Sequence, residues 1–184
     1  AIWGEQTIFN DVQQLTPASI LRVSLGSTLH IEHYEPEFSA EISAYSLEEA
    51  GEALDALLQV EVERMLSADV PPCIVTSGGL DSTYLTALAS AFSPNIHSFN
   101  VAYAGDWPFD ERQYARKAAR QYQANYHQVE IQESEFPFLL EKMVKHIGQP
   151  NNAPHCISTY ALFAAIKEHG FKFALTGEGA DEMF

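Results

Sequence analysis

The run Ser77-Gly78-Gly79-Leu80-Asp81-Ser82 is the part of the sequence best suited to chemistry. A β-favouring run ends just before it and a helical pattern begins within it, so two glycines stand at a strand-to-helix turn. Glycine lets a ligand approach the backbone closely, and the free amides and dipole of a helix start favour phosphate. The Ser77 and Ser82 hydroxyls add donors. The segment is therefore predicted to bind a phosphate group.

Asp81 is the unexpected member of this segment, because a carboxylate repels a bare phosphate. Its position makes sense if a divalent cation lies between the carboxylate and phosphate oxygens, as Mg²⁺ commonly does with one or two carboxylates. The alternative is structural: an Asp that caps a helix after a Gly-Gly turn.

A second acidic segment, Thr176-Gly177-Glu178-Gly179-Ala180-Asp181-Glu182, follows another β-favouring run. Two familiar nucleotide signatures are absent, since no Gly-x-x-x-x-Gly-Lys occurs and Gly177-Glu178-Gly179 lacks the third glycine of a dinucleotide fingerprint. Exposed acidic loops are common. A functional role for this segment is therefore indicated only if the fold places it beside the first motif.

Short apolar runs alternate with longer amphipathic ones from Pro72 onward, which predicts an α/β fold with a parallel twisted sheet and helices on both faces. With strand order 3-2-1-4, the ends of the first and fourth strands are neighbours where the winding reverses, and ligands bind at such switch points. Both motifs would then face one pocket. The expected strands are 73–76, 96–101, 126–131 and 171–176, and the expected helices are 82–92, 110–122, 135–147 and 157–169.

The first 45 residues differ from the rest. Runs at 20–23 and 28–34 predict a hairpin with Gly26-Ser27 at its turn. The sequence from Ser46 to Glu49 is a capping box that should open a helix reaching about residue 68. We therefore expect a β-rich segment over 1–37, a linker over 38–45 and the main domain over 46–184.

Composition excludes several classes of function. Ten Lys plus Arg against 25 Asp plus Glu give a net charge of −15, which disfavours nucleic acid and anionic membrane surfaces as partners. No apolar run approaches the roughly 20 residues of a membrane span, and no signal peptide is apparent, so a cytoplasmic protein is expected. Cys73 and Cys156 do not indicate a disulfide framework. His30 with His33, or His155 beside Cys156, could bind a metal, but no second pair at ligand spacing accompanies either, so a metal site is not predicted there.

The first motif resembles the pyrophosphate loop of the N-type ATP pyrophosphatases. The second, through Phe184, resembles the Ser-Gly-Glu-Gly-Ala-Asp-Glu-Leu-Phe segment of asparagine synthetases. The resemblance covers 46–184, with the synthetase domain apparently truncated at its C-terminal end, and implies an adenine nucleotide α-hydrolase-like fold. Thr7-Ile8-Phe9 and Leu15-Thr16-Pro17 resemble the tail of the preceding glutaminase-like domain.

This resemblance implies ATP-dependent amide formation through an acyl-adenylate, with aspartate, ATP and ammonia or glutamine as substrates, Mg²⁺ as cofactor, and a possible homodimer. Glu178 matches the acidic residue associated with adenylate formation and amine attack. Asp81 and Asp181 would bind Mg²⁺. The implied pyrophosphate residues are Ser77, Gly78, Gly79, Asp81 and Ser82, and the implied adenosine residues are Thr76, Val101, Thr176 and Gly177.

A departure from the family pattern bears on the identity of the substrate. Gly148-Gln149-Pro150 stands where many relatives carry Asp-Glu-Pro. This favours, as alternatives, another carboxylate joined to an intramolecular amine, as in β-lactam synthetases and lasso-peptide cyclases. An ATP-binding domain without turnover is a further alternative. The glutaminase nucleophile of the family is an N-terminal cysteine, and no cysteine precedes Cys73, so glutamine hydrolysis by this chain is not expected.

Overall fold

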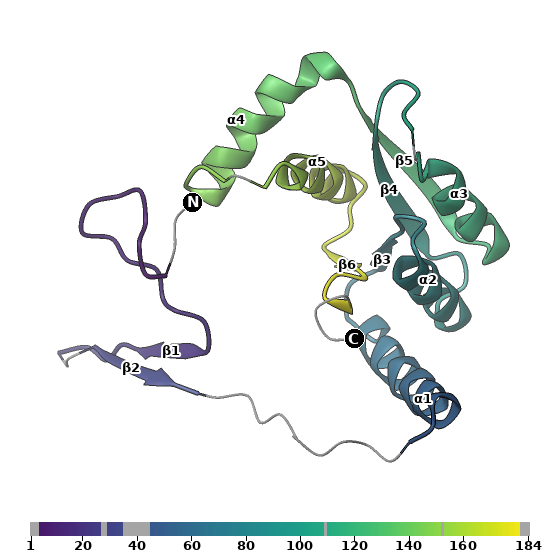
Figure 1. Ribbon diagram of the computed structural model, residues 1–184, viewed down its shortest axis with the longest axis horizontal. Helices are drawn as coiled ribbons and strands as arrows, with labels where there is room; N and C mark the ends of the chain where they lie inside the picture. The colour runs from purple at the N-terminus through teal and green to yellow at the C-terminus, as the bar shows by residue number, and fades with distance from the viewer. Residues whose placement is uncertain (1–3, 27–28, 35–44, 109, 152, 181–184) are drawn as a thin grey trace.

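A computed structural model describes residues 4–26, 29–34, 45–108, 110–151 and 153–180. Its central feature is a four-stranded sheet in the order β5-β4-β3-β6, in which every neighbouring pair is parallel (Figure 1). The strands are β3 (Pro72–Val75), β4 (His97–Tyr103), β5 (Asn125–Ile131) and β6 (Phe173–Leu175). The predicted parallel sheet and its 3-2-1-4 order are both confirmed.

Helices cover both faces of this sheet, also as predicted. On one face, Val62 of α1 and Leu88 and Ala89 of α2 pack on Ile74. On the other, Leu162 and Ile166 of α5 pack on Cys73 and Phe99. The helices are α1 (Leu47–Leu66), α2 (Leu80–Phe92), α3 (Arg112–Gln121), α4 (Phe136–Ile147) and α5 (His155–Glu168), with a short 3-10 turn, η1 (Glu133–Glu135), before α4.

The last strand is shorter than the sequence predicted. Phe171 lies in the turn that follows α5 rather than in the strand, since its N–H donates to the Ile166 carbonyl at 3.2 Å and its ring packs on His97 and Phe99. Thr176 lies beyond the strand and starts the loop that carries the second motif. The sheet therefore ends just before both motifs, which places them at one edge.

The helix α1 begins with the predicted capping box. The Glu49 N–H donates to the Ser46 hydroxyl oxygen at 3.3 Å, and the Ser46 N–H donates to the Glu49 carboxylate at 2.8 Å. Because both groups at the helix start are satisfied by neighbours in sequence, the start of α1 is set locally.

The N-terminal region forms the expected hairpin, with β1 (Ser19–Arg22) antiparallel to β2 (His30–His33) in a separate two-stranded sheet. Gly26 adopts a φ of +80° at the turn, and its predicted partner Ser27 lies outside the described residues. Most of the expected linker also lies outside them, so the division at 37 and 46 stays a prediction. Within the described residues, no helix is long and apolar enough to cross a membrane.

Candidate functional site

The two motifs meet in one cavity of about 510 Å³ at the carboxyl edge of the sheet. A β-carbon added at Gly177 would lie 3.2 Å from the Ser82 nitrogen and 3.4 Å from the Asp81 β-carbon, so the second motif packs directly on the start of α2. The strand order brings this about because β3 and β6 are hydrogen-bonded neighbours. The cavity is lined by Val75, Ser77, Gly79, Asp81, Ser82, His155, Thr176, Gly177, Glu178, Gly179 and Ala180.

The Ser82 side chain holds the glycine loop in place by hydrogen bonds to its backbone. Its hydroxyl oxygen accepts from the N–H groups of Ser77 and Gly78, both at 3.2 Å, and donates to the Gly79 carbonyl at 3.2 Å. The Gly79 N–H in turn donates to the Ser77 hydroxyl oxygen at 3.2 Å. The loop amides are thus satisfied internally, and the amides left for an anion are those in the first turn of α2, which has no side-chain cap.

Gly78 serves the packing of the loop against α3. It has a φ of +100°, and an added β-carbon would lie 2.7 Å from the Ala115 nitrogen and 3.0 Å from the Glu111 carbonyl oxygen. Only glycine fits both the backbone angle and the space. The predicted glycine is therefore required for the shape of the loop, whatever the loop binds.

Thr76 lies behind the cavity rather than in its wall. Its side chain is fully buried. Its hydroxyl lies 2.8 Å from that of Thr86 and accepts from the Ser98 hydroxyl at 2.9 Å. The cavity is instead lined by its neighbours Val75 and Ser77.

Val101 lines a second cavity of about 340 Å³, on the β4 side of the loop. Ser77 lines both cavities, so the glycine loop forms the boundary between them. The second cavity is lined by Ser77, Asn100, Val101, Ala102, Tyr103, Trp107, Asp110, Glu111 and Arg112.

An apolar cavity of about 490 Å³ adjoins the site on the side of α1 and α2. Leu54, Leu58 and Leu80 contribute to its wall, and Asp81 and Glu178 line it as well as the first cavity. The two carboxylates therefore stand between a polar and an apolar space.

The acidic residues of the site have free carboxylates. Asp81 and Glu178 are exposed, and neither forms a hydrogen bond or ion pair with another described residue. The described residues contain no group of three metal-binding side chains. Asp181 lies outside them. A free carboxylate in the first turn of a helix that has no side-chain cap fits Mg²⁺, which takes most of its ligands from substrate phosphates and water.

Among the lining residues that the sequence analysis did not assign to a binding site are His155 and Trp107. His155 begins α5, and its imidazole is the one basic side chain among the described residues of the first cavity. Trp107 lines the second. The signal for Trp107 was its place in a Gly-Asp-Trp-Pro loop directly after a strand, where the carboxyl ends of parallel strands hold binding residues.

The geometry defines a class of protein: a parallel α/β domain in which a glycine loop at a helix start and an acidic loop line one cavity. The particular family is the Asparagine synthase family, to which the chain belongs: residues 53–184 match it. The predicted family is thereby confirmed.

The relatives give the same family. The chain is 32% identical over 119 residues to Asparagine synthetase [glutamine-hydrolyzing] 1 of Bacillus subtilis, covering 65% of this chain and 18% of that protein. It is 25% identical over 182 residues to a putative asparagine synthetase [glutamine-hydrolyzing] of Mycobacterium bovis, covering 97% of this chain and 28% of that protein. The chain thus spans less than a third of the length of either relative.

Among solved structures, the chain is similar to the glutamine-dependent NAD+ synthetase from Acinetobacter baumannii in complex with adenosine diphosphate. The TM-score is 0.48 and the sequence identity 18%, over 88% of this chain and 31% of that one.

Proposed function

We propose that this chain is the ATP-binding part of a ligase that forms an amide through an acyl-adenylate. The observation that carries the proposal is the meeting of both motifs in one cavity, with the uncapped start of α2 beside the free carboxylates of Asp81 and Glu178. Membership of the Asparagine synthase family supports it.

The backbone of Val101 supports the adenosine part of the proposal. In a parallel strand, residues two apart point their N–H and C=O groups to the same side. The Phe99 carbonyl accepts from the Thr76 N–H at 2.9 Å, so it points toward β3. The N–H and C=O of Val101 point to the same side, but β3 ends at Val75 and does not reach them. Within the described residues neither group has a partner on that side. They offer one donor and one acceptor to the edge of a base.

The phosphates would lie at the first turn of α2, with Ser77 between them and the base. Asp81 is placed to bind Mg²⁺ there, and Asp181 is proposed as the second carboxylate. The ion would neutralise phosphate charge and polarise the α-phosphorus. The free carboxylate of Asp81 and the phosphate-binding helix start fit this role.

In the proposed reaction, a carboxylate oxygen of the acid substrate bonds to the α-phosphorus of ATP, and the bond to the bridging oxygen breaks, releasing pyrophosphate. The amine nitrogen then bonds to the acyl carbon, and AMP leaves with the carboxylate oxygen. Glu178 faces the same cavity with a free carboxylate, so it is suited to accept the proton that the amine must lose.

We propose that the substrates are aspartate and either ammonia or glutamine. We also propose that the protein acts in the cytoplasm. Gly148-Gln149-Pro150 keeps another acid with an intramolecular amine as the second candidate, because this segment lacks the acidic pair of many relatives.

The test is ATP–pyrophosphate exchange by the full protein with Mg²⁺, using aspartate and a panel of other carboxylic acids without an amine. Exchange with aspartate supports asparagine synthesis, and exchange with another acid alone moves the substrate assignment. Measurable ATP binding without any exchange would contradict the adenylation itself.

A further inference from the structure

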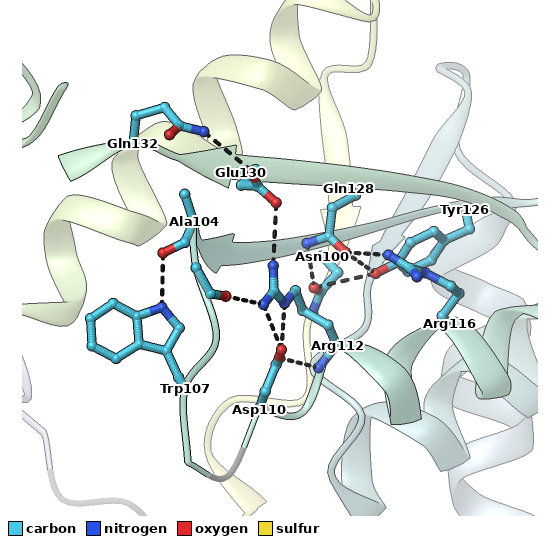
Figure 2. Close-up of polar contacts among 11 residues, drawn as sticks. Asn100, Ala104, Trp107, Asp110, Arg112, Arg116, Tyr126, Gln128, Glu130 and Gln132 are labelled. Atoms are coloured by element: carbon cyan, nitrogen blue, oxygen red, sulfur yellow. Dashed lines mark hydrogen bonds and ion pairs between the residues drawn. The ribbon is translucent and has the colours of Figure 1, made fainter. Parts of the chain in front are cut away.

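The second cavity has few polar side-chain groups left for a ligand. The Asn100 amide donates to the Thr76 carbonyl at 2.9 Å. Its oxygen accepts from the Gln128 amide at 3.0 Å and from the Tyr126 hydroxyl at 3.4 Å (Figure 2). What remains, besides the Glu111 carboxylate and the Tyr103 hydroxyl, is aromatic and aliphatic surface together with the backbone edge of Val101. Such a lining suits a flat ring that carries hydrogen-bonding groups on its rim.

The Arg112 guanidinium is also fully engaged, so the cavity is not a second anion site. Arg112 donates to the Asp110 carboxylate at 2.7 Å, to the Glu130 carboxylate at 3.2 Å and to the Gly105 carbonyl at 2.6 Å. Its side chain is 18% exposed. The bonds that the Arg112 side chain and N–H donate to Asp110 hold the pKa of the Asp110 carboxyl below its usual range, so this pair stays charged.

The Arg112 contacts anchor the loop that carries Trp107. They join the loop at Gly105 and Asp110 to β5 at Glu130, and the indole N–H of Trp107 donates to the Ala104 carbonyl at 3.0 Å (Figure 2). The indole is thus fixed at the rim of the cavity, although it is 59% exposed. A fixed and exposed aromatic ring costs little further ordering when a ligand covers it.

We infer that Trp107 forms a wall of the nucleobase site and contributes to ATP affinity by packing against the base, with Arg112 as the positioning residue of its loop. The inference rests on the proposed function, which puts the base at Val101. It adds a residue that neither motif contains.

The test titrates the full protein, with Mg²⁺, by calorimetry with ATP and with inorganic tripolyphosphate, which carries the phosphates without the base. Trp107→Ala is expected to weaken ATP binding about ten-fold, in the range found for loss of an aromatic that stacks on a base. Tripolyphosphate binding is expected to stay unchanged. Trp107→Phe should keep most of the ATP affinity, because it keeps an aromatic face.

Phe138→Ala is the matched control, since Phe138 on α4 is 57% exposed and lines neither cavity. Unchanged ATP affinity in Trp107→Ala would overturn the inference, and so would an equal loss for ATP and tripolyphosphate, which would mean that the loop had collapsed. A wild-type protein that binds ATP no better than tripolyphosphate, or binds neither, would instead overturn the proposed function.

Discussion

Asp81 shows how a single residue separates function from stability. Its carboxylate is exposed and makes no hydrogen bond or ion pair within the described residues, so Asp81→Asn should lower the free energy of unfolding by no more than about 1 kcal/mol, the value of a charge in the first turn of a helix. Pyrophosphate exchange should fall by about 100-fold or more, the scale on which the loss of a charge-stabilising group costs catalysis. Asp69→Asn, the same change at an exposed site outside the cavities, is the control. Undiminished exchange in Asp81→Asn would remove Asp81 from the metal assignment.

Gly78 makes the opposite case, because its role is steric. Gly78→Ala should cost about 1–2 kcal/mol for the left-handed backbone and about 1–3 kcal/mol more for the clash with α3. Gly148→Ala isolates the first contribution, since Gly148 has a φ of +84° and open space around it. Urea unfolding of both variants measures the difference. Equal losses of unfolding free energy in the two variants would mean that α3 shifts to accommodate the added β-carbon without an energetic cost.

At the scale of elements, one hydrogen bond joins the two helices on the same face of the sheet. The Tyr84 hydroxyl of α2 donates to the Asp55 carboxylate of α1. This bond raises the pKa of Tyr84 to about 12, with burial and the charge of Asp55 adding to it.

Tyr84→Phe should therefore lower the free energy of unfolding by about 1 kcal/mol or somewhat more, the usual value of such a bond. Tyr160→Phe on α5 is the matched control, because the Tyr160 hydroxyl has no hydrogen-bond partner in the described part of the chain. Chemical denaturation of the two variants gives the comparison. A loss no greater than that of the control would show that α1 is held by apolar packing alone.

At the scale of the whole molecule, a histidine cluster ties α5 to the sheet at the edge opposite the site. The His127 ring stacks on His97 and Phe99, with centroids 4.9 and 4.6 Å apart, and meets the edge of His169. His127 Nε2 lies 2.8 Å from His97 Nδ1. Burial, with added repulsion from the two other histidines, lowers the pKa of His127 below its ordinary 6.5. The folded state thus favours the neutral ring.

This shift makes the stability of the fold sensitive to acid. The unfolded chain binds the proton of His127 more readily than the folded chain does. The stability that the packing of the neutral His127 ring contributes is therefore fully present above pH 6.5 and is lost as the pH falls below it. His127→Phe keeps the stacking and removes the titration, so its unfolding free energy should depend less on pH between 7.5 and 5.5, a range of about one unit on either side of an ordinary histidine pKa. His146→Phe, at an exposed position on α4, should retain the wild-type dependence. If the unfolding free energy of the wild type, His127→Phe and His146→Phe fell equally with pH, His127 would not be the source of the acid sensitivity.

Local patterns in the sequence predicted the alternation of strands and helices, the parallel sheet and the capping box of α1, because each depends mainly on neighbouring residues. The order of the strands entered only as a condition, and the last strand was predicted too long. The local patterns also identified both motifs and the family. Only the tertiary structure decided what lies around those motifs: that Gly78 packs on α3, that Ser82 supports the loop, that Thr76 is buried, and that Trp107 stands beside Val101. The reason is that these contacts join segments distant in the chain, and such contacts depend on how α3 and the loop before it pack.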